Sequence, residues 1–224
     1  MSDDSFIREV DEELRSDRMK SIWKRFGKYI IGIAVLIVVG TAADRGYDYW
    51  TKSQASKSGD AFLAALNLAR EGRQDEALAA LRALEKDGYG SYPALARMRA
   101  ATVLADTGDH QAAISDFSTI GNDRSVPAAI SDIARIKAAY LLVDYGSYDE
   151  VVAQVESLSV ADNPMRHSAR EALGLAAWKA GEFIQARKWF DQIIGDTGVP
   201  AGVTQRAQIM LDVIAASGNA GQQS

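Results

Sequence analysis

The chain has 224 residues but no cysteine, only four prolines and only two histidines. The absence of cysteine excludes disulfide bonds, zinc–thiolate sites and thiol nucleophiles. Neither His110 nor His167 has a second histidine or a glutamate at metal-ligand spacing on one helix face, so we expect both to be solvated turn residues. So few prolines in an alanine-rich chain containing Leu, Glu and Arg predict a helical protein.

The motifs of common enzyme classes are also missing. Gly-x-Gly-x-x-Gly, P-loop and nucleophile-elbow patterns do not occur. Two acidic pairs, Asp75/Glu76 and Asp149/Glu150, stand where helices are predicted to begin, and there they favour the helix dipole. We therefore predict that the protein is not an enzyme and binds no cofactor or metal.

The formal net charge of −5 is unevenly distributed. Residues 59–224 carry 21 acidic and 15 basic residues, whereas residues 1–58 carry 9 acidic and 10 basic ones. Because contacts with phosphates need a basic surface, the larger, acidic part argues against nucleic acid as a partner.

Residues 29–43 form an apolar run without a charge, and eight of its members are Ile, Leu or Val. As a helix this run reaches about 22 Å, and with residues 26–28 about 27 Å, close to the roughly 30 Å of a bilayer core. Aromatic residues flank both ends, as expected at membrane interfaces: Trp23, Phe26, Tyr29, Tyr47, Tyr49 and Trp50. We predict a single membrane-spanning helix.

Two alternatives to a membrane anchor remain open. A cleaved signal peptide normally begins with a short basic segment, but 28 residues with seven acidic side chains precede this run. Small residues at 40–43 still offer a cleavage site. A buried core helix normally has one apolar stripe, whereas this segment is apolar on all sides.

The distribution of Lys and Arg predicts the orientation. Five cations lie within the eleven residues before the run and three within about fifteen residues after it, which keeps the N-terminus in the cytoplasm. The expected organisation is a cytoplasmic tail (1–25), the anchor and its interfacial flank (26–50), a linker or continuing exposed helix (51–59), a repeat domain (60–217) and a disordered tail (218–224).

A repeat begins near residue 60 and is aligned on Gly72, Gly108, Gly146 and Gly181. Their spacings of 36, 38 and 35 residues are close to the 34 of a tetratricopeptide unit. Four other columns stand seven residues before each glycine and five, nine and twelve after it: Ala65/Ala101/Ala139/Gly174, Ala77/Ala113/Val151/Ala186, Leu81/Phe117/Val155/Phe190 and Leu84/Ile120/Leu158/Ile193.

This pattern predicts two closely packed helices in each unit. Small residues let the helices approach, and each glycine is expected to end the first helix in a left-handed conformation. All four prolines fall between units, and residues 204–217 form an amphipathic segment suited to a capping helix. We predict an all-α fold: one transmembrane helix, then a tetratricopeptide-like α-solenoid of about four hairpins plus a C-terminal cap.

Each unit resembles a tetratricopeptide repeat, although the usual early tryptophan of the first helix is absent. The usual aromatic residue two positions after the glycine is present as Tyr148 and Phe183 but is replaced by Gln74 and His110 in the other two units. An anchor followed by four such units resembles the YfgM-like family, ancillary subunits of the SecYEG translocon in Gram-negative inner membranes. This resemblance covers the chain from about Trp23 to its C-terminus and depends on the architecture. It implies a single-pass inner-membrane protein with a periplasmic repeat domain, a scaffold that positions a membrane-anchored periplasmic chaperone or peptidyl-prolyl isomerase beside SecYEG.

A stack of helical hairpins offers a groove lined by the first helices. The repeat alignment predicts these groove residues: Arg70, Arg97, Met98, Thr102, Arg135, Tyr140, Arg170 and Trp178. Arg97, Arg135 and Arg170 share one repeat position and either pair with a partner's carboxylates or pair within the domain. Trp178 either binds a partner or packs between helices.

Two further functions remain as alternatives. One is an envelope-assembly adaptor for cell-division, cell-wall or outer-membrane machinery, because repeats of this kind serve many partners. The other is an enzyme or metal-binding protein, which requires a polar pocket or metal ligands that the sequence does not indicate.

Overall fold

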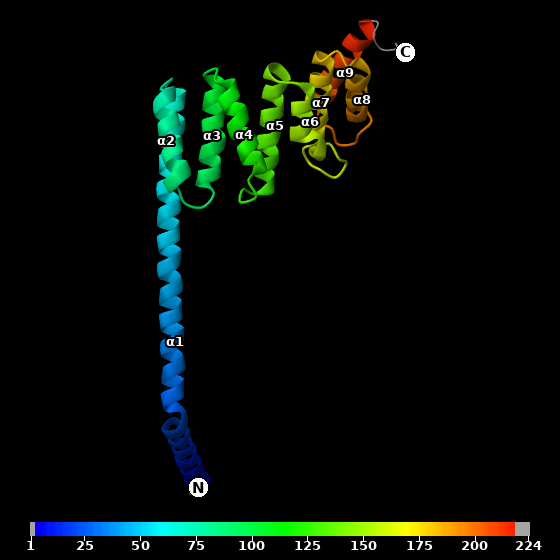
Figure 1. The fold of residues 1–224 in the computed structure, drawn as a ribbon. Helices are drawn as coiled ribbons and strands as arrows, with labels where there is room; N and C mark the ends of the chain where they lie inside the picture. The colour runs from blue at the N-terminus through cyan, green and yellow to red at the C-terminus, as the bar shows by residue number, and fades with distance from the viewer. Residues whose placement is uncertain (1–2, 218–224) are drawn as a thin grey trace. The chain divides into compact units, whose positions relative to one another are not determined.

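The computed structural model describes the backbone of residues 3–217 and the side chains of residues 20, 23–29 and 31–217. Within this range the secondary structure is entirely helical (Figure 1). Contacts divide the chain into two units, Met1–Gln54 and Ala55–Ser224. The tail expected to be disordered, residues 218–224, lies outside the described residues.

The first unit consists of helix α1 (Asp3–Arg70), which continues into the second unit. Within α1, Trp23–Arg70 contains a stretch that is long and apolar enough to cross a membrane, and only 6% of that stretch is buried. Residues 51–59, for which the sequence allowed a linker or a continuing helix, are helical throughout.

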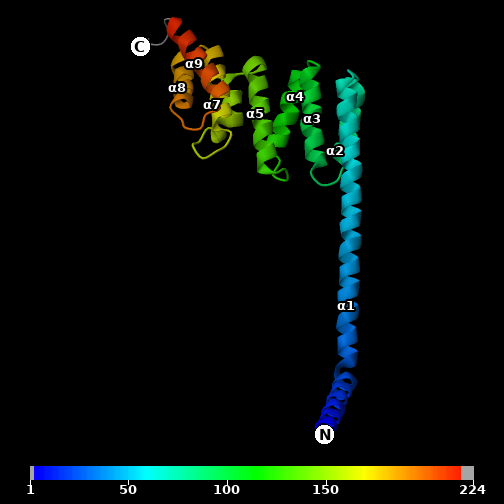
Figure 2. The same cartoon turned by 180° about the vertical axis from the view of Figure 1, so that it is seen from behind.

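The second unit is a succession of helical hairpins. The end of α1 pairs with α2 (Gln74–Asp87), and the next pairs are α3 (Tyr92–Asp106) with α4 (His110–Asn122), and α5 (Ala128–Tyr145) with α6 (Tyr148–Val155). A short 3-10 helix, η1 (Glu156–Leu158), follows α6, and α7 (Arg166–Lys179) then pairs with α8 (Phe183–Ile194). Both views show these pairs side by side in chain order, with α9 (Ala201–Ala216) last (Figures 1 and 2).

The predicted packing columns form the core of these hairpins. Every residue of the four columns is buried, including all of the small ones. At the one small position occupied by glycine, a Cβ atom on Gly174 would lie 2.7 Å from the Phe190 ring. The backbones therefore approach as closely as the sequence predicted.

Four clusters make up this core, and they follow the chain. One joins α1, α2 and α3, and the next joins α3, α4 and α5. A third spans α4 to α8, and the fourth joins α7, α8 and α9. Because each cluster includes the first helix of the following hairpin, the stack is held together by neighbouring contacts, as in a solenoid. Val203, Ala207 and Ile214 of α9 cover its C-terminal end, which confirms the predicted cap.

The turn glycines follow the prediction at three of four positions. Gly72, Gly108 and Gly181 have φ values of 81°, 90° and 80° and end the first helix in the left-handed conformation. The prediction was wrong for Gly146, whose φ of −133° is extended. There Ser147 and Glu150 form a capping box that starts α6 directly.

Candidate protein-interaction surface

The predicted groove residues all lie on the first helices of the hairpins: Arg70 on α1, Arg97, Met98 and Thr102 on α3, Arg135 and Tyr140 on α5, and Arg170 and Trp178 on α7. They differ in what their side chains do. The three equivalent arginines point into contacts within the domain, whereas other members remain accessible.

Arg97 joins two hairpins. Its Nη1 donates to Oδ2 of Asp123 at 2.7 Å, and its Nε lies 3.3 Å from Oε1 of Glu85. The first contact is to the end of its own hairpin and the second to the end of the preceding one. Hydrogen bonds from Ser125 and then from Arg97 lower the pKa of the Asp123 carboxyl to about 2. The contacts therefore hold the charged form of Asp123.

Arg170 makes the equivalent connection two hairpins further along the chain. Its Nε donates to the Ser159 carbonyl at 3.0 Å, and its Nη1 donates to Oδ2 of Asp196 at 2.6 Å. Arg166 also binds Asp196, with Nε at 2.7 Å from the same oxygen. Hydrogen bonds from Arg166 and then Arg170 hold the pKa of Asp196 well below its usual range. Arg170 is itself buried.

Arg135 repeats half of this geometry. Its Nε donates to the Gly121 carbonyl at 2.9 Å, and a Cβ atom on Gly121 would lie 2.6 Å from its Cγ. Glu85, Gly121 and Ser159 all stand thirteen residues after the preceding turn glycine, and Asp123 and Asp196 stand fifteen after their own. The third hairpin has Ala161 at that last position, so Arg135 has no equivalent acid. We call Arg97, Arg135 and Arg170 the bracket arginines. In the structure all three bind groups within the domain, which is the second of the two alternatives left open by the sequence.

A second group of polar contacts connects the repeats to the capping helix α9. Glu171 on α7 is only 3% exposed, yet it accepts from Tyr140 Oη at 2.8 Å and from Arg206 Nε at 2.5 Å and Nη2 at 2.9 Å. Burial first, and the Glu171 charge next, raise the pKa of Tyr140 above its usual range. The hydroxyl of this predicted groove residue is therefore already used to connect α5, α7 and α9.

An accessible stripe remains on the same helices. Leu95, Met98 and Thr102 follow an i, i+3, i+7 spacing on α3, which places them on one face. Ile133 and Tyr140 occupy the same repeat positions as Leu95 and Thr102, while Trp178 stands one turn further along α7. Leu95, Ile133 and Trp178 are 37%, 40% and 39% exposed. We call these six residues the first-helix stripe. Leu95 and Ile133 both stand thirteen residues before their turn glycine, so the glycine alignment could have predicted them, but they were not among the predicted groove residues.

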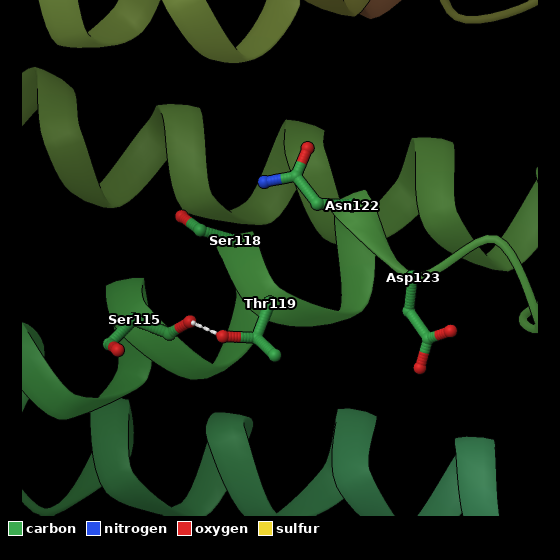
Figure 3. Close-up of a pocket in the computed structure, with 5 residues that line it drawn as sticks. All are labelled: Ser115, Ser118, Thr119, Asn122 and Asp123. Atoms are coloured by element: carbon green, nitrogen blue, oxygen red, sulfur yellow. Dashed lines mark hydrogen bonds between the residues drawn. The ribbon is translucent and has the colours of Figure 1, made fainter.

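Among the described residues, hollows also lie elsewhere on the repeats, and two of them are polar. Figure 3 shows the larger, of about 540 Å³, lined by polar side chains of α4 and the residue after it: Ser115, Ser118, Thr119, Asn122 and Asp123. Thr119 Oγ1 donates to the Ser115 carbonyl at 2.8 Å, the contact drawn there. The other, of about 450 Å³, lies around Arg97 and the loops on either side of the second hairpin. Among the described residues no group of three His, Asp or Glu side chains is placed to hold a metal ion.

The expectation of solvated histidines was wrong. His167 is 7% exposed, and its Nε2 lies 3.2 Å from Oδ2 of Asp196. His110 stacks on the Tyr145 ring, with the ring centroids 3.9 Å apart. Both lie near a helix start. Tyr145 of the next hairpin covers His110, and His167 lies against Asp196 at the end of its own hairpin, contacts that a turn position in the sequence does not reveal.

Comparison with known families agrees with this geometry. A family profile described as "Tetratricopeptide repeat-like domain" matches residues 20–216, most of the chain. The chain belongs to this tetratricopeptide repeat-like family. The matched range contains the apolar stretch of α1 as well as all four hairpins and the cap. No curated protein and no solved structure matches the chain.

The tetratricopeptide pattern explains where the bracket arginines stand. In that pattern a tryptophan precedes the small residue of the first helix by four positions. Here those positions hold Ala61, Arg97, Arg135 and Arg170. The missing tryptophan is thus replaced in three units by an arginine that binds neighbouring turns through hydrogen bonds instead of apolar packing.

Membership in this family indicates a protein-interaction scaffold. Tetratricopeptide-like repeats present a continuous surface of stacked helices to protein partners, and their function depends on the side chains displayed there. In this chain the first-helix stripe displays the partly exposed apolar side chains of Leu95, Ile133 and Trp178. We therefore take it, together with exposed Arg70, as the candidate interaction surface.

Proposed function

We propose that this protein is a non-enzymatic scaffold anchored in a bacterial inner membrane by one helix, with its repeat domain in the periplasm. As in the YfgM-like proteins that it resembles, the repeats recruit a membrane-anchored chaperone or peptidyl-prolyl isomerase beside the SecYEG translocon. Such a scaffold raises the local concentration of its partner near emerging chains without performing chemistry itself.

The observation that carries the proposal is the unburied apolar stretch of α1. Ile31, Leu36 and Val38 are 55%, 71% and 67% exposed, and the other apolar residues of 31–39 are exposed as well. Such a run is unfavourable in water but favourable in a bilayer, at about −0.3 to −0.6 kcal/mol for each Ile, Leu or Val. The same chain carries a repeat domain with exposed apolar residues, which fits a scaffold restricted to partners at a membrane.

The charges on either side of the apolar run support the orientation. Five cations precede it closely and three follow, so the N-terminal side stays cytoplasmic. The absence of cysteine from the natural sequence makes this testable with single introduced thiols. Lys24→Cys and Lys188→Cys place one thiol on each side, and both native side chains are exposed.

A membrane-impermeant maleimide, applied to cells with a permeabilised outer membrane, tests the topology. We expect labelling of Lys188→Cys and none of Lys24→Cys until the inner membrane is lysed. Labelling of Lys24→Cys alone would reverse the orientation. Equal labelling of both thiols before lysis, or release of the protein into the soluble fraction, would contradict a single span.

Affinity purification in mild detergent followed by mass spectrometry tests the partners. We expect translocon subunits and a membrane-anchored chaperone or isomerase to be recovered with the full chain. Recovery of neither would count against the translocon role. A focus of tagged protein at the division septum would instead support an envelope-assembly adaptor, whereas an even distribution along the membrane agrees with the translocon.

A further inference from the structure

The segment of α1 just before the apolar run is strongly basic. Lys24, Arg25 and Lys28 lie on it, Arg18 and Lys20 precede them in sequence, and no Asp or Glu occurs between Asp17 and Asp44. Asp17 is seven residues before Lys24, which corresponds to about 10 Å along a helix. We call Lys24, Arg25 and Lys28 the basic collar; its charges have no carboxylate within one helical turn along the chain.

Aromatic rings accompany the collar. Trp23, Phe26 and Tyr29 are 58%, 48% and 59% exposed. Arg25 lies over the Phe26 ring with its Cζ 5.8 Å from the centroid, and Lys28 Nζ lies 5.2 Å from the Tyr29 centroid. Aromatic residues prefer the headgroup level of a bilayer, so each of these cations is paired with a ring that prefers the depth of lipid phosphates.

The opposite side of the apolar run is built differently. Two acids, Asp44 and Asp48, stand among its cations, and Lys52 Nζ lies 2.6 Å from Oδ2 of Asp48. Asp44 directly precedes Arg45. The two ends of the run thus differ in kind as well as in number of cations. After the run Lys52 pairs with an acid one helical turn away, whereas no acid lies within one turn of the basic collar along the chain.

We propose that the basic collar binds anionic lipid headgroups, a specificity that rests on the membrane span proposed above and goes beyond its orientation. Basic side chains at a membrane surface attract anionic lipids, and the aromatic partners hold the cations at the depth where the phosphates lie. A zwitterionic headgroup offers the same phosphate but adds a cation that the collar repels. The collar therefore distinguishes lipids by net charge.

Tryptophan fluorescence of the full chain in vesicles tests this inference. Trp23 stands in the collar and Trp50 beyond the other end of the run, whereas Trp178 and Trp189 belong to the repeat domain. The variants Trp50→Phe and Trp23→Phe each keep one of the two reporters, and Trp23→Phe/Trp50→Phe measures the contribution of Trp178 and Trp189 that is subtracted from both. All three are reconstituted in vesicles containing brominated phosphatidylglycerol or brominated phosphatidylcholine, whose bromine atoms quench nearby tryptophan. With Trp23 as reporter, we expect the anionic lipid to quench about threefold more effectively than the neutral one. Trp50 is expected to show no such preference.

Charge-neutral variants identify the residues responsible. Lys24→Gln/Arg25→Gln/Lys28→Gln in the Trp23 reporter is expected to bring the preference to parity, whereas the matched control Arg45→Gln/Lys52→Gln/Lys57→Gln keeps it. Equal quenching of Trp23 by the two lipids in the parent, or a preference that survives neutralisation of the collar, would overturn the lipid proposal while leaving the span intact. Absence of quenching at both tryptophans would overturn the span itself.

Discussion

Arg170 and Asp196 lie at opposite ends of the fourth hairpin in sequence, yet their Nη1 and Oδ2 atoms are 2.6 Å apart. The same arginine also bonds the Ser159 carbonyl of the preceding hairpin. One guanidinium therefore connects the third hairpin to the fourth and also joins the two helices of the fourth hairpin. Arg97 makes the equivalent connection two hairpins earlier, between Glu85 and Asp123.

Removing this bracket is expected to destabilise the repeats. Arg170→Met keeps most of the apolar stem but leaves the Ser159 and Gln192 carbonyls and Asp196 without one of their donors. We expect the free energy of unfolding to fall by about 2 kcal/mol, the scale of hydrogen bonds to a charged group. Thermal unfolding of the full chain in mild detergent, followed by circular dichroism, measures the change.

Arg135→Met is the matched control for that variant. Arg135 occupies the same repeat position but bonds a single carbonyl, that of Gly121, and has no acid opposite it. Its replacement is expected to cost less than half as much. Equal losses for the two variants would mean that the packing of the arginine side chain, and not its contact with the Asp196 carboxylate, holds neighbouring hairpins together.

The Glu171–Arg206 pair is expected to be strongly coupled. Arg206 is 58% exposed, so solvent screens its charge, but its loss leaves the buried carboxylate of Glu171 with Tyr140 as its main donor. We expect Arg206→Met to cost about 1–2 kcal/mol, more than an exposed ion pair usually contributes. In Glu171→Met/Arg206→Met no charge remains buried, and the loss should be smaller than the sum of the single losses.

Chemical unfolding of the four proteins in this cycle gives the coupling directly. Limited proteolysis adds a local readout, because α9 is held by this pair and by Val203, Ala207 and Ile214. Faster cleavage near α9 in Arg206→Met, reversed in the double variant, is the expected result. Strict additivity would show that the pair contributes nothing beyond its separate side chains.

Acid is expected to weaken the second hairpin through Asp123. Its pKa is lowered from 3.8 to about 2 in the folded chain, so folding favours the charged form. The resulting stability is present above the unfolded pKa and is lost as the pH falls through the folded one. The difference in melting temperature between the parent and Asp123→Asn should therefore be constant near pH 6 and shrink between about pH 4 and pH 2.

Ser125→Ala separates the two causes of that shift. The Ser125 hydroxyl makes the larger contribution and Arg97 a smaller one, so this variant should keep part of the pH dependence. A difference that widens on acidification would contradict the assignment, because it would require Asp123 to favour the protonated form in the folded chain.

The sequence predicted the repeating core well because that core depends on local periodicity. Ala65, Ala101 and Ala139 were assigned to helix crossings from their spacing to the turn glycines, and each is fully buried. At the third turn the Ser147–Glu150 capping box is readable in the sequence as a Ser-x-x-Glu motif, but the glycine alignment gave all four turns the same conformation.

The side-chain partners were harder to predict. Asp123 and Asp196 stand at one repeat position, and Arg97 and Arg170 at another. Asp87 shares the acid position in the first hairpin, where the arginine position holds Ala61, so the two columns alone do not give the pairing. What the sequence did not contain was the path of the loops that bring the acids back to the first helices. For that reason the arginines were placed in the groove with their partners left open.

The first-helix stripe yields the sharpest test of function. Leu95 and Ile133 are partly exposed and occupy the same repeat position, so Leu95→Ser/Ile133→Ser removes apolar surface with little loss of packing. If partners dock there, this variant should recover about tenfold less of them in affinity purification, since two contacts of an interface core are lost. Ile184→Ser/Ile209→Ser is the matched control, because those two residues are 56% and 52% exposed on α8 and α9. Equal loss of partner recovery in both variants would assign the effect to general surface hydrophobicity. Unchanged recovery with the stripe variant, at an unchanged melting temperature, would place the docking surface elsewhere on the repeats.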